Sequence, residues 1–245
     1  MTDTDSYRSR LRDEQRARDY ATRFERGPRR RIDRREQQAV RRIFSRLTDC
    51  RTVLDVPCGA GRFLANLAKE GRGVVEMDAA VEVLEFARQR AERLGVCARF
   101  IPGDAARMPI ADEGVDAVFC NRLLHHIAVA EERAVFLREF HRVCRRWVVV
   151  SFFDYLAFGR LRRWLKALKG RRVDYSGQPT VAQFGEEVAR AGFRVCELVL
   201  TGPPWVSQKY FVLEKYRPDP AVATATVTVQ DSRAHPAPPS GHQAA

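Results

Sequence analysis

The sequence predicts a doubly wound α/β fold, in which helices cover both faces of a mostly parallel, seven-stranded sheet with an antiparallel strand at its edge. Short apolar segments alternate with amphipathic helical segments between residues 52 and 151. Such alternation requires parallel strands joined by right-handed crossovers. A glycine-rich turn follows the first apolar segment. The last two strands are separated by Gly202-Pro203-Pro204 rather than by a helix, so they can pair antiparallel.

Each expected strand is a short apolar run bounded by turn residues. The fifth, residues 147–151, is apolar as a central strand buried on both faces should be. The expected helices place apolar residues at helical spacing, and Gly192 provides a stop for the last one. In chain order we expect strands at 52–56, 73–77, 98–101, 115–120, 147–151, 193–200 and 209–214, and helices at 62–70, 81–94, 130–143 and 180–191.

Three regions flank or interrupt this core. Residues 1–30 are polar and arginine-rich and predict a flexible basic segment. The domain itself spans 31–216, with a cap helix over 32–48 and a basic amphipathic insertion at 155–170. Residues 217–245 have too little apolar content to fold, so we expect a disordered tail. Because the first residues lack an apolar signal segment and no long apolar run follows, we expect a cytoplasmic location.

The composition gives weaker indications. The formal net charge is +12, and only five of the 43 basic residues are lysines. Clustered arginines can bind phosphates, but an arginine excess is also typical of a GC-rich genome, so we do not expect a nucleic-acid partner. The basic cap and the insertion fit an anionic substrate or association with a membrane surface. Six scattered cysteines form no C-x-x-C pair, and we expect no metal site.

The turn after the first strand carries the most chemistry. Gly59 and Gly61 let a ligand approach the backbone closely at the point where doubly wound sheets bind ligands. A phosphate-binding Walker loop is excluded because no Lys-Ser or Lys-Thr pair follows. A dinucleotide fingerprint is excluded because Leu64 stands at its third glycine. Asp55, just before the turn, suits a ligand with a positively charged head, such as S-adenosylmethionine (AdoMet).

Four segments, in order, resemble motifs of class I AdoMet-dependent methyltransferases. They are residues 53–62 around the turn, 74–80, 100–105 and 115–127, and the resemblance covers residues 52–144. The subgroup it is most similar to is the ubiquinone/menaquinone-biosynthesis-like (methyltransferase type 11) enzymes. The resemblance implies a Rossmann-like fold and the cofactor AdoMet. It implies a cofactor site made of Asp55, Pro57, Cys58, Gly59, Gly61, Asp78, Ala79, Asp104, Ala105 and Asn121.

The resemblance also assigns roles, and each has a structural alternative. Asp78 would bind both ribose hydroxyls, or it caps the following helix. Asp104 would accept from the adenine amino group, or it is an ordinary loop residue. Asp55 could instead accept backbone N–H groups of the turn, and Asn121 could merely close the fourth strand. Pro57 departs from the motif because it replaces a glycine and removes one backbone N–H.

A second departure is the missing Pro-Gly-Gly turn before the fifth strand, where Arg142–Trp147 runs directly on. His125 and His126 are candidates for a general base, since the histidine pKa lies near neutral pH, or they serve packing and capping. Asp154 and Tyr155 follow the fifth strand on the same edge and could touch the acceptor. The candidates for the methionine carboxylate of AdoMet are Arg62, Arg122 and Arg29–Arg31.

The expected function is transfer of a methyl group from AdoMet to a small-molecule acceptor by in-line displacement. A quinone precursor, a lipid-like molecule or a secondary metabolite would each fit as acceptor. Two alternatives stay open: an RNA or protein methyltransferase, and a non-catalytic partner protein with the AdoMet fold. No metal is implied in any of these mechanisms.

Overall fold

The computed structural model describes residues 24, 27–154, 178–203, 206 and 208–216. The expected N-terminal segment therefore lies almost wholly outside the described residues, as do the insertion, Tyr155 and the tail. None of the described helices is long and apolar enough to cross a membrane.

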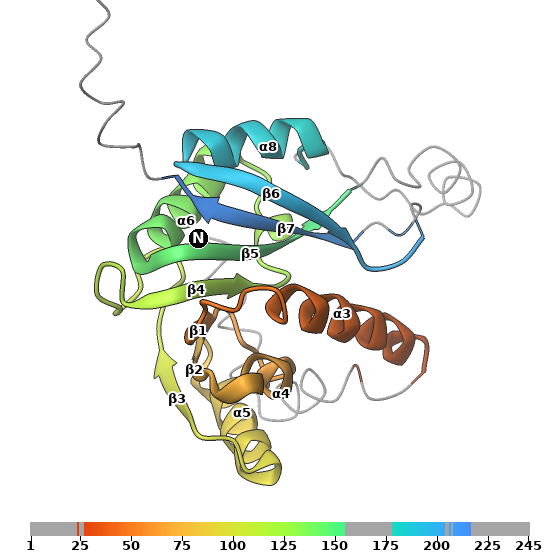
Figure 1. Ribbon diagram of the computed structural model, residues 1–245, viewed down its shortest axis with the longest axis vertical. Helices are drawn as coiled ribbons and strands as arrows, with labels where there is room; N and C mark the ends of the chain where they lie inside the picture. Colours follow the sequence, from red (N-terminus) through yellow and green to blue (C-terminus); the bar gives the residue numbers. More distant parts are fainter. Residues whose placement is uncertain (1–23, 25–26, 155–177, 204–205, 207, 217–245) are drawn as a thin grey trace, which may run out of the picture.

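One mixed sheet organises the described residues, with strand order β3-β2-β1-β4-β5-β7-β6 (Figure 1). β1 to β5 pair in parallel, and β7 runs antiparallel to both β5 and the edge strand β6. The mostly parallel sheet with an antiparallel end is thereby confirmed. The strands are β1 (Thr52–Asp55), β2 (Gly73–Asp78), β3 (Ala98–Pro102), β4 (Val115–Cys120), β5 (Cys144–Phe153), β6 (Phe193–Leu200) and β7 (Gln208–Lys215).

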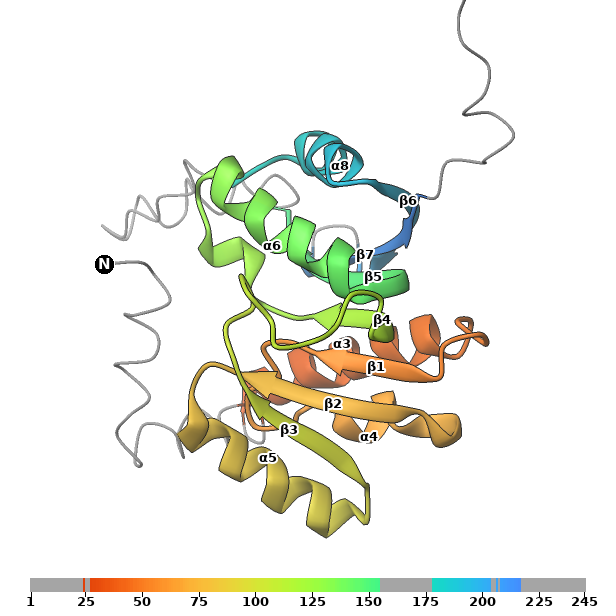
Figure 2. The same ribbon diagram turned by 90° about the vertical axis from the view of Figure 1, so that its left-hand side faces the viewer.

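Helices cover both faces of the sheet (Figure 2). On one face, α3 (Pro28–Phe44), α4 (Leu64–Leu67) and the end of α5 (Val81–Leu94) pack over an apolar cluster centred on Phe119 of β4. On the other face, α6 (Ala130–Val143) and α8 (Val181–Arg190) pack over β4, β5 and β7. Short 3-10 turns occur at Lys69–Gly71 (η1) and Leu124–His126 (η2).

Two helix predictions were wrong in their bounds. The helix expected over 62–70 is reduced to the four residues of α4, because turns occupy the chain up to Phe63 and Glu70 has a left-handed φ of 61°. The cap helix expected over 32–48 spans Pro28–Phe44 instead. Proline is favoured in the first turn of a helix, so α3 begins before the apolar pattern becomes visible.

α3 runs along the strands, from the carboxyl ends of the parallel strands to their amino ends. Glu36 bonds to Arg122, which follows β4, whereas the carbonyl of Phe44 accepts from Arg72, which precedes β2. The N-terminal half of α3 therefore lies beside the carboxyl ends of the parallel strands, where open α/β sheets bind ligands.

Candidate cofactor and active site

The fold brings the predicted acids to one edge of the sheet. Asp55 and Asp78 are the last residues of β1 and β2, and Asp104 follows β3 by two residues. Asn121 comes directly after β4. Because these four strands are neighbours and all parallel, the residues that follow them converge on a single edge. Pro57, Cys58 and Ala79 lie in the loops between these strand ends and the next helices.

The loop after β1 is fastened to the strands on both sides of it. The backbone N–H of Val56 donates to the carbonyl of Phe119 on β4 at 2.9 Å, and that of Cys58 donates to Met77 on β2 at 2.9 Å. Gly61 has a φ of 65°, and a Cβ there would lie 3.2 Å from the Cβ of Ala87 on α5. Glycine is therefore required at position 61 both for its backbone conformation and for its lack of a side chain.

The Asp78 carboxylate links this loop to the start of α5. It is fully buried, and its two oxygens accept the backbone N–H groups of Gly59 and Ala80, each at 2.9 Å. α5 begins at Val81 and Ala80 occupies the N-cap position, so Asp78 does not cap the helix. A carboxylate oxygen can accept more than one hydrogen bond. Asp78 can therefore accept from the ribose hydroxyls, as predicted, while it keeps its bonds to Gly59 and Ala80.

Asp55 has no hydrogen-bond donor among the described residues, although it is only 1% exposed. The alternative that it accepts N–H groups of the turn is therefore not what the structure shows. Burial, reinforced by the neighbouring Glu76, raises the pKa of Asp55 well above its ordinary value. A buried carboxylate without a donor costs free energy unless a cation or donor arrives. The cationic end of AdoMet is such a group, so these residues fit this cofactor.

The three remaining predicted positions, Asp104, Ala105 and Asn121, differ in their surroundings. Asp104 accepts the backbone N–H of Ala106 at 2.9 Å and is half-buried, as a loop acid would be, while Ala105 beside it is buried. The Asn121 side chain is bound to β7, where its oxygen accepts from the hydroxyl of Tyr210 at 3.0 Å and from Gln208 at 3.2 Å. The adenine and cofactor contacts predicted for these residues stay predictions.

A buried cluster of charges joins α3 to this edge, and the sequence analysis missed its centre, Glu36. This side chain is 1% exposed and pairs with both Arg62 and Arg122. Asp33 binds Arg62 as well, at 2.7 Å. Burial opposes the charge of Arg62, yet Glu36 and its neighbours hold the pKa of this guanidinium above its ordinary value. The signal was present, because Glu36 lies one helical turn before Val40 on the apolar face of α3.

Arg62 and Arg122, both predicted candidates for the methionine carboxylate, differ in how their donors are occupied within this cluster. Arg62 is committed to two carboxylates of α3. Arg122 binds Glu36 and, at 2.9 Å, Gln208, but its Nε has no acceptor among the described residues. Arg122 therefore retains a donor, whereas Arg62 serves to hold α3. Arg29–Arg31 lie exposed on α3.

The candidate acceptor side lies beyond β4 and β5. His125 and His126 form part of η2, where their rings are tilted against each other with centroids 4.0 Å apart; the His125 ring is also tilted against Phe153, at 4.5 Å. Neither caps α6, whose N-cap is Val129. Asp154, at the end of β5, is buried in an ion pair with Lys209 of β7, a partner that the sequence did not reveal. The catalytic role of the two histidines stays a prediction.

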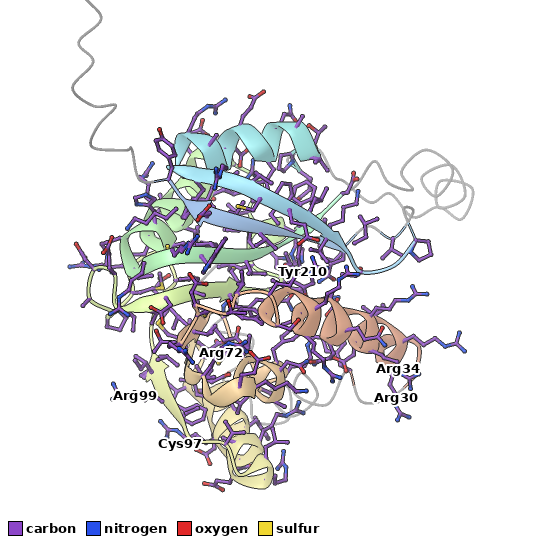
Figure 3. All side chains as sticks on the ribbon, in the orientation of Figure 1. Arg30, Arg34, Arg72, Cys97, Arg99 and Tyr210 are labelled. Atoms are coloured by element: carbon purple, nitrogen blue, oxygen red, sulfur yellow. The ribbon has the colours of Figure 1, made fainter. Side chains whose placement is uncertain are left out.

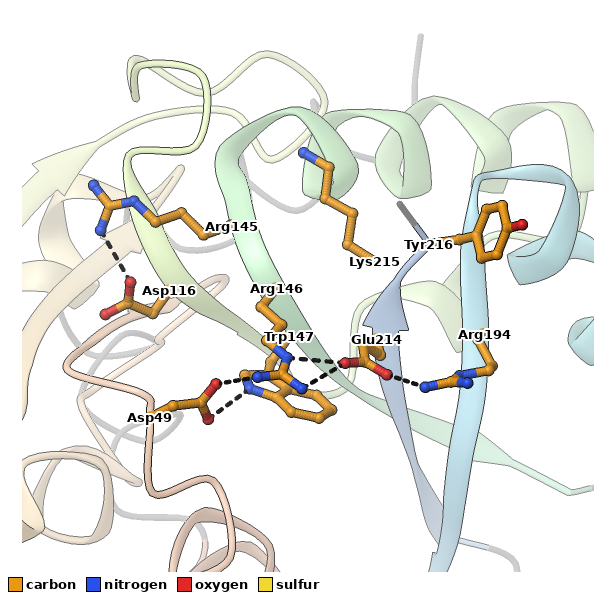
Figure 4. Close-up of a pocket in the computed structure, with 9 residues that line it drawn as sticks. All are labelled: Asp49, Asp116, Arg145, Arg146, Trp147, Arg194, Glu214, Lys215 and Tyr216. Atoms are coloured by element: carbon orange, nitrogen blue, oxygen red, sulfur yellow. Dashed lines mark hydrogen bonds and ion pairs between the residues drawn. The ribbon is translucent and has the colours of Figure 1, made fainter. Parts of the chain in front are cut away.

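The groove in Figure 4 is on the opposite edge of the sheet, where β4 and β5 begin and β7 ends. Its charges bind one another: Arg146 pairs with Asp49 and Glu214, and Arg145 pairs with Asp116. Since these groups neutralise each other and lie away from the glycine-rich loop, this groove is not the candidate site.

Comparison with known proteins finds methyltransferases among the proteins similar to this chain. Residues 54–150 match the family model described as "Methyltransferase domain". A malonyl-[acyl-carrier protein] O-methyltransferase of Hamiltonella defensa is 30% identical over 115 residues, which cover 47% of this chain and 42% of that protein. A demethylmenaquinone methyltransferase of Deinococcus radiodurans is 40% identical over 72 residues, covering 29% of this chain and 30% of that protein. The matches thus span less than half of these relatives' length.

The crystal structure of magnesium protoporphyrin IX methyltransferase from Synechocystis with bound SAH has a TM-score of 0.69. It covers 87% of this chain and 100% of that chain at 19% identity, so the likeness concerns the fold. Residues 54–150 thus match the class of methyltransferase domains, and the fold is shared with a methyltransferase solved with bound SAM or SAH. Within this class, its relatives include the quinone-biosynthesis methyltransferases that the sequence motifs resemble.

Proposed function

We propose that this protein transfers the methyl group of AdoMet to a small-molecule acceptor. The observation that carries the proposal is the Asp55 carboxylate, which is buried without a donor beneath a loop shaped by Gly59 and Gly61. A pyrophosphate would be repelled by this charge, whereas a sulfonium and an ammonium group would be attracted to it. The match of residues 54–150 to a methyltransferase domain supports the same conclusion.

The residues divide the binding of the cofactor among them. Asp78 would hold the ribose hydroxyls, Asp104 the adenine amino group, Asp55 the cationic end and Arg122 the carboxylate. When bound, AdoMet supplies a methyl group on a sulfonium, which is already a good leaving group. The task of the chain is therefore to hold donor and acceptor near attack geometry, which can account for about 7–11 kcal/mol of a barrier.

For the acceptor, we infer a small molecule held beside β4 and β5. The relatives include a malonyl-[acyl-carrier protein] O-methyltransferase and a demethylmenaquinone methyltransferase, and both support this class of reaction. If the acceptor has a proton to lose, the exposed His126 is better placed to exchange it with solvent than the half-buried His125, whose ring lies against Phe153. The quinone precursor, the lipid-like molecule and the secondary metabolite all stay within this proposal, as does the cytoplasmic location.

We further propose that α3 attaches the protein to an anionic membrane surface. Both acids of α3 turn inward to Arg62, whereas its arginines face outward. We call the exposed group Arg29, Arg30, Arg31, Arg34, Arg35 and Arg42 the arginine face; none of its members forms an ion pair with another described residue. Figure 3 shows Arg30 and Arg34 projecting from the N-terminal end of α3, which lies beside the carboxyl ends of the parallel strands. An acceptor dissolved in the membrane would thus meet the active site at the surface.

Calorimetric titration with AdoMet tests the proposed activity. We expect the parent protein to bind AdoMet and Asp78→Ala to bind at least about a hundredfold more weakly, because two charge-assisted hydrogen bonds are lost. Asp112→Ala is the matched control, since this aspartate is exposed and away from the loop. A folded parent without detectable binding would contradict the proposal. Binding followed by labelled methyl transfer to quinone precursors or lipid extracts would then identify the acceptor.

A further inference from the structure

Asp55, the proposed partner of the cationic end of AdoMet, forms a pair of buried carboxylates with Glu76, to which the methyl-transfer mechanism gives no role. They are register partners on the adjacent parallel strands β1 and β2, and they are 1% and 0% exposed. Both follow the period-two pattern that places Val53 and Val74 in the cluster beneath α3 and α4, so the two side chains share a face of the sheet. No N–H or O–H group among the described residues donates to either carboxylate. The Cys58 thiol, a weak donor, lies beside Glu76.

The charges around the pair do not neutralise it. Arg62 acts on Asp55 from the loop after β1, but it already binds two carboxylates of α3. Arg90 of α5 acts on Glu76, while Asp78 adds a further negative charge on β2. Burial raises the pKa of both nearby thiols, Cys58 in the loop and Cys120 on β4, so neither thiol is a source of charge.

Two like charges side by side in a buried position cannot both persist at neutral pH. Burial raises the pKa of Glu76 to about 8, and burial together with Glu76 raises the pKa of Asp55. Coupled carboxylates of this kind titrate as a pair rather than as separate residues. Burial and mutual repulsion thus favour a ligand-free pair that keeps a proton at pH 7.

We propose that AdoMet binding expels this proton, so that the Asp55–Glu76 pair acts as a charge-dependent selector for the cationic cofactor. The inference rests on the proposed function. The proton passes to water or buffer, and both carboxylates then face the positive charges of the cofactor. A neutral adenosine derivative supplies no charge to replace the proton, so the pair keeps it. Glu76 is a positioning and specificity residue in this scheme, acting through Asp55.

The sign of the pH dependence follows from proton counting. Free protein carries one more proton than the complex, so affinity for AdoMet rises with pH. Between about pH 6 and pH 7 the α-amino group of AdoMet stays charged and does not contribute. In that interval we expect the Kd to fall about tenfold per pH unit for the parent protein. For Glu76→Gln it should fall less steeply, because the variant removes the repulsion on Asp55 but not its burial.

Calorimetric titration at pH 7 in two buffers of different ionisation enthalpy counts the protons directly. We expect release of about one proton per AdoMet for the parent and for the control Glu92→Gln, whose glutamate is exposed on α5. Glu76→Gln should release less, and the parent should release none with 5′-methylthioadenosine, which lacks both positive charges. AdoMet binding without proton release, or equal release from Glu76→Gln, would overturn the inference. Absence of AdoMet binding would instead overturn the proposed function and this inference with it.

A second measurement needs no cofactor. The folded pKa of Glu76 lies above its ordinary 4.5, so the stability that its proton provides is present below that pH and is lost as pH rises toward 8. We expect the Tm of Glu76→Gln to exceed that of the parent increasingly between these two values, while Glu92→Gln follows the parent. A constant difference between Glu76→Gln and the parent across this interval would show that the pair holds no proton.

Discussion

Glu36 illustrates how a single carboxylate can organise a site without touching a ligand. It accepts from Arg62 after β1 and from Arg122 after β4, and thereby fixes α3 to two loops of the candidate site. Phe24 lies against the same two guanidinium groups, with ring centroids 4.2 and 5.1 Å from their central carbons. The N-terminal half of α3 is thus held by charge, whereas its C-terminal half is held by apolar burial.

Removing this charge should destabilise the protein. For Glu36→Gln we expect the free energy of unfolding to fall by about 3 kcal/mol, the low end for a broken buried pair, because Arg62 keeps Asp33. Glu197→Gln is the matched control, since its partner Arg46 is exposed and such pairs contribute about 0–1 kcal/mol. Urea unfolding of the two variants and the parent measures both values. Equal losses from Glu36→Gln and Glu197→Gln would show that the buried pair contributes no more to the free energy of unfolding than the exposed pair.

At the scale of elements, the sequence predicted every strand of the described sheet within a few residues but misplaced two helices. β4, β6, α5 and α6 have the predicted bounds, because their apolar patterns end where turn residues begin. β5 is longer than predicted, since Arg145 and Arg146 extend it while their charged ends reach solvent and ion pairs. The helix after the glycine-rich loop, α4, is shorter than predicted because tertiary contacts hold residues 57–63 in turns. Local periodicity contains no information about those contacts.

α8 shows local rules that do determine an element. Thr180 accepts the backbone N–H of Gln183 at 3.2 Å, and the Gln183 side chain accepts that of Thr180 at 2.9 Å. This capping box fixes the helix start, and burial of Phe184 and Val188 fixes its inner face. We expect Thr180→Ala to lower the free energy of unfolding by about 1 kcal/mol, measured by urea unfolding. Thr180→Ser keeps the hydroxyl and should retain most of the stability; a loss as large as that of Ala would show that the cap is not responsible.

At the scale of the whole molecule, the sequence located the acids of the site but not their partners. Asp55, Asp78 and Asp104 lie at or just after the ends of predicted strands, and parallel pairing alone brings them to the carboxyl ends of the sheet. The partners of Glu36 and Asp154 are far away in the chain, on loops and strands whose approach only the packed sheet defines. Glu76 has a local signal in the sequence, because it is an acid within the apolar run of β2, two residues before Asp78.

At the same scale, the arginine face of α3 predicts binding to anionic membranes. Each arginine near an anionic membrane surface contributes about 1 kcal/mol to binding, so the arginine face provides enough free energy for reversible attachment. We expect the parent to co-sediment with phosphatidylglycerol vesicles at low salt, but not with phosphatidylcholine vesicles, and to dissociate as salt screens the charges. Arg30→Glu combined with Arg34→Glu should weaken binding by at least about thirtyfold, since two favourable charges are lost.

The control for this experiment is Arg88→Glu combined with Arg138→Glu, which changes the net charge equally on the exposed surfaces of α5 and α6. If both double variants lose binding equally, attachment depends on total charge and α3 is not a docking surface. If the parent ignores anionic vesicles yet binds RNA with a steep salt dependence, the arginine face serves a nucleic acid instead. Weakening confined to the α3 variant would place the membrane beside the cofactor edge, where a lipid-like acceptor could reach the active site without leaving the bilayer surface.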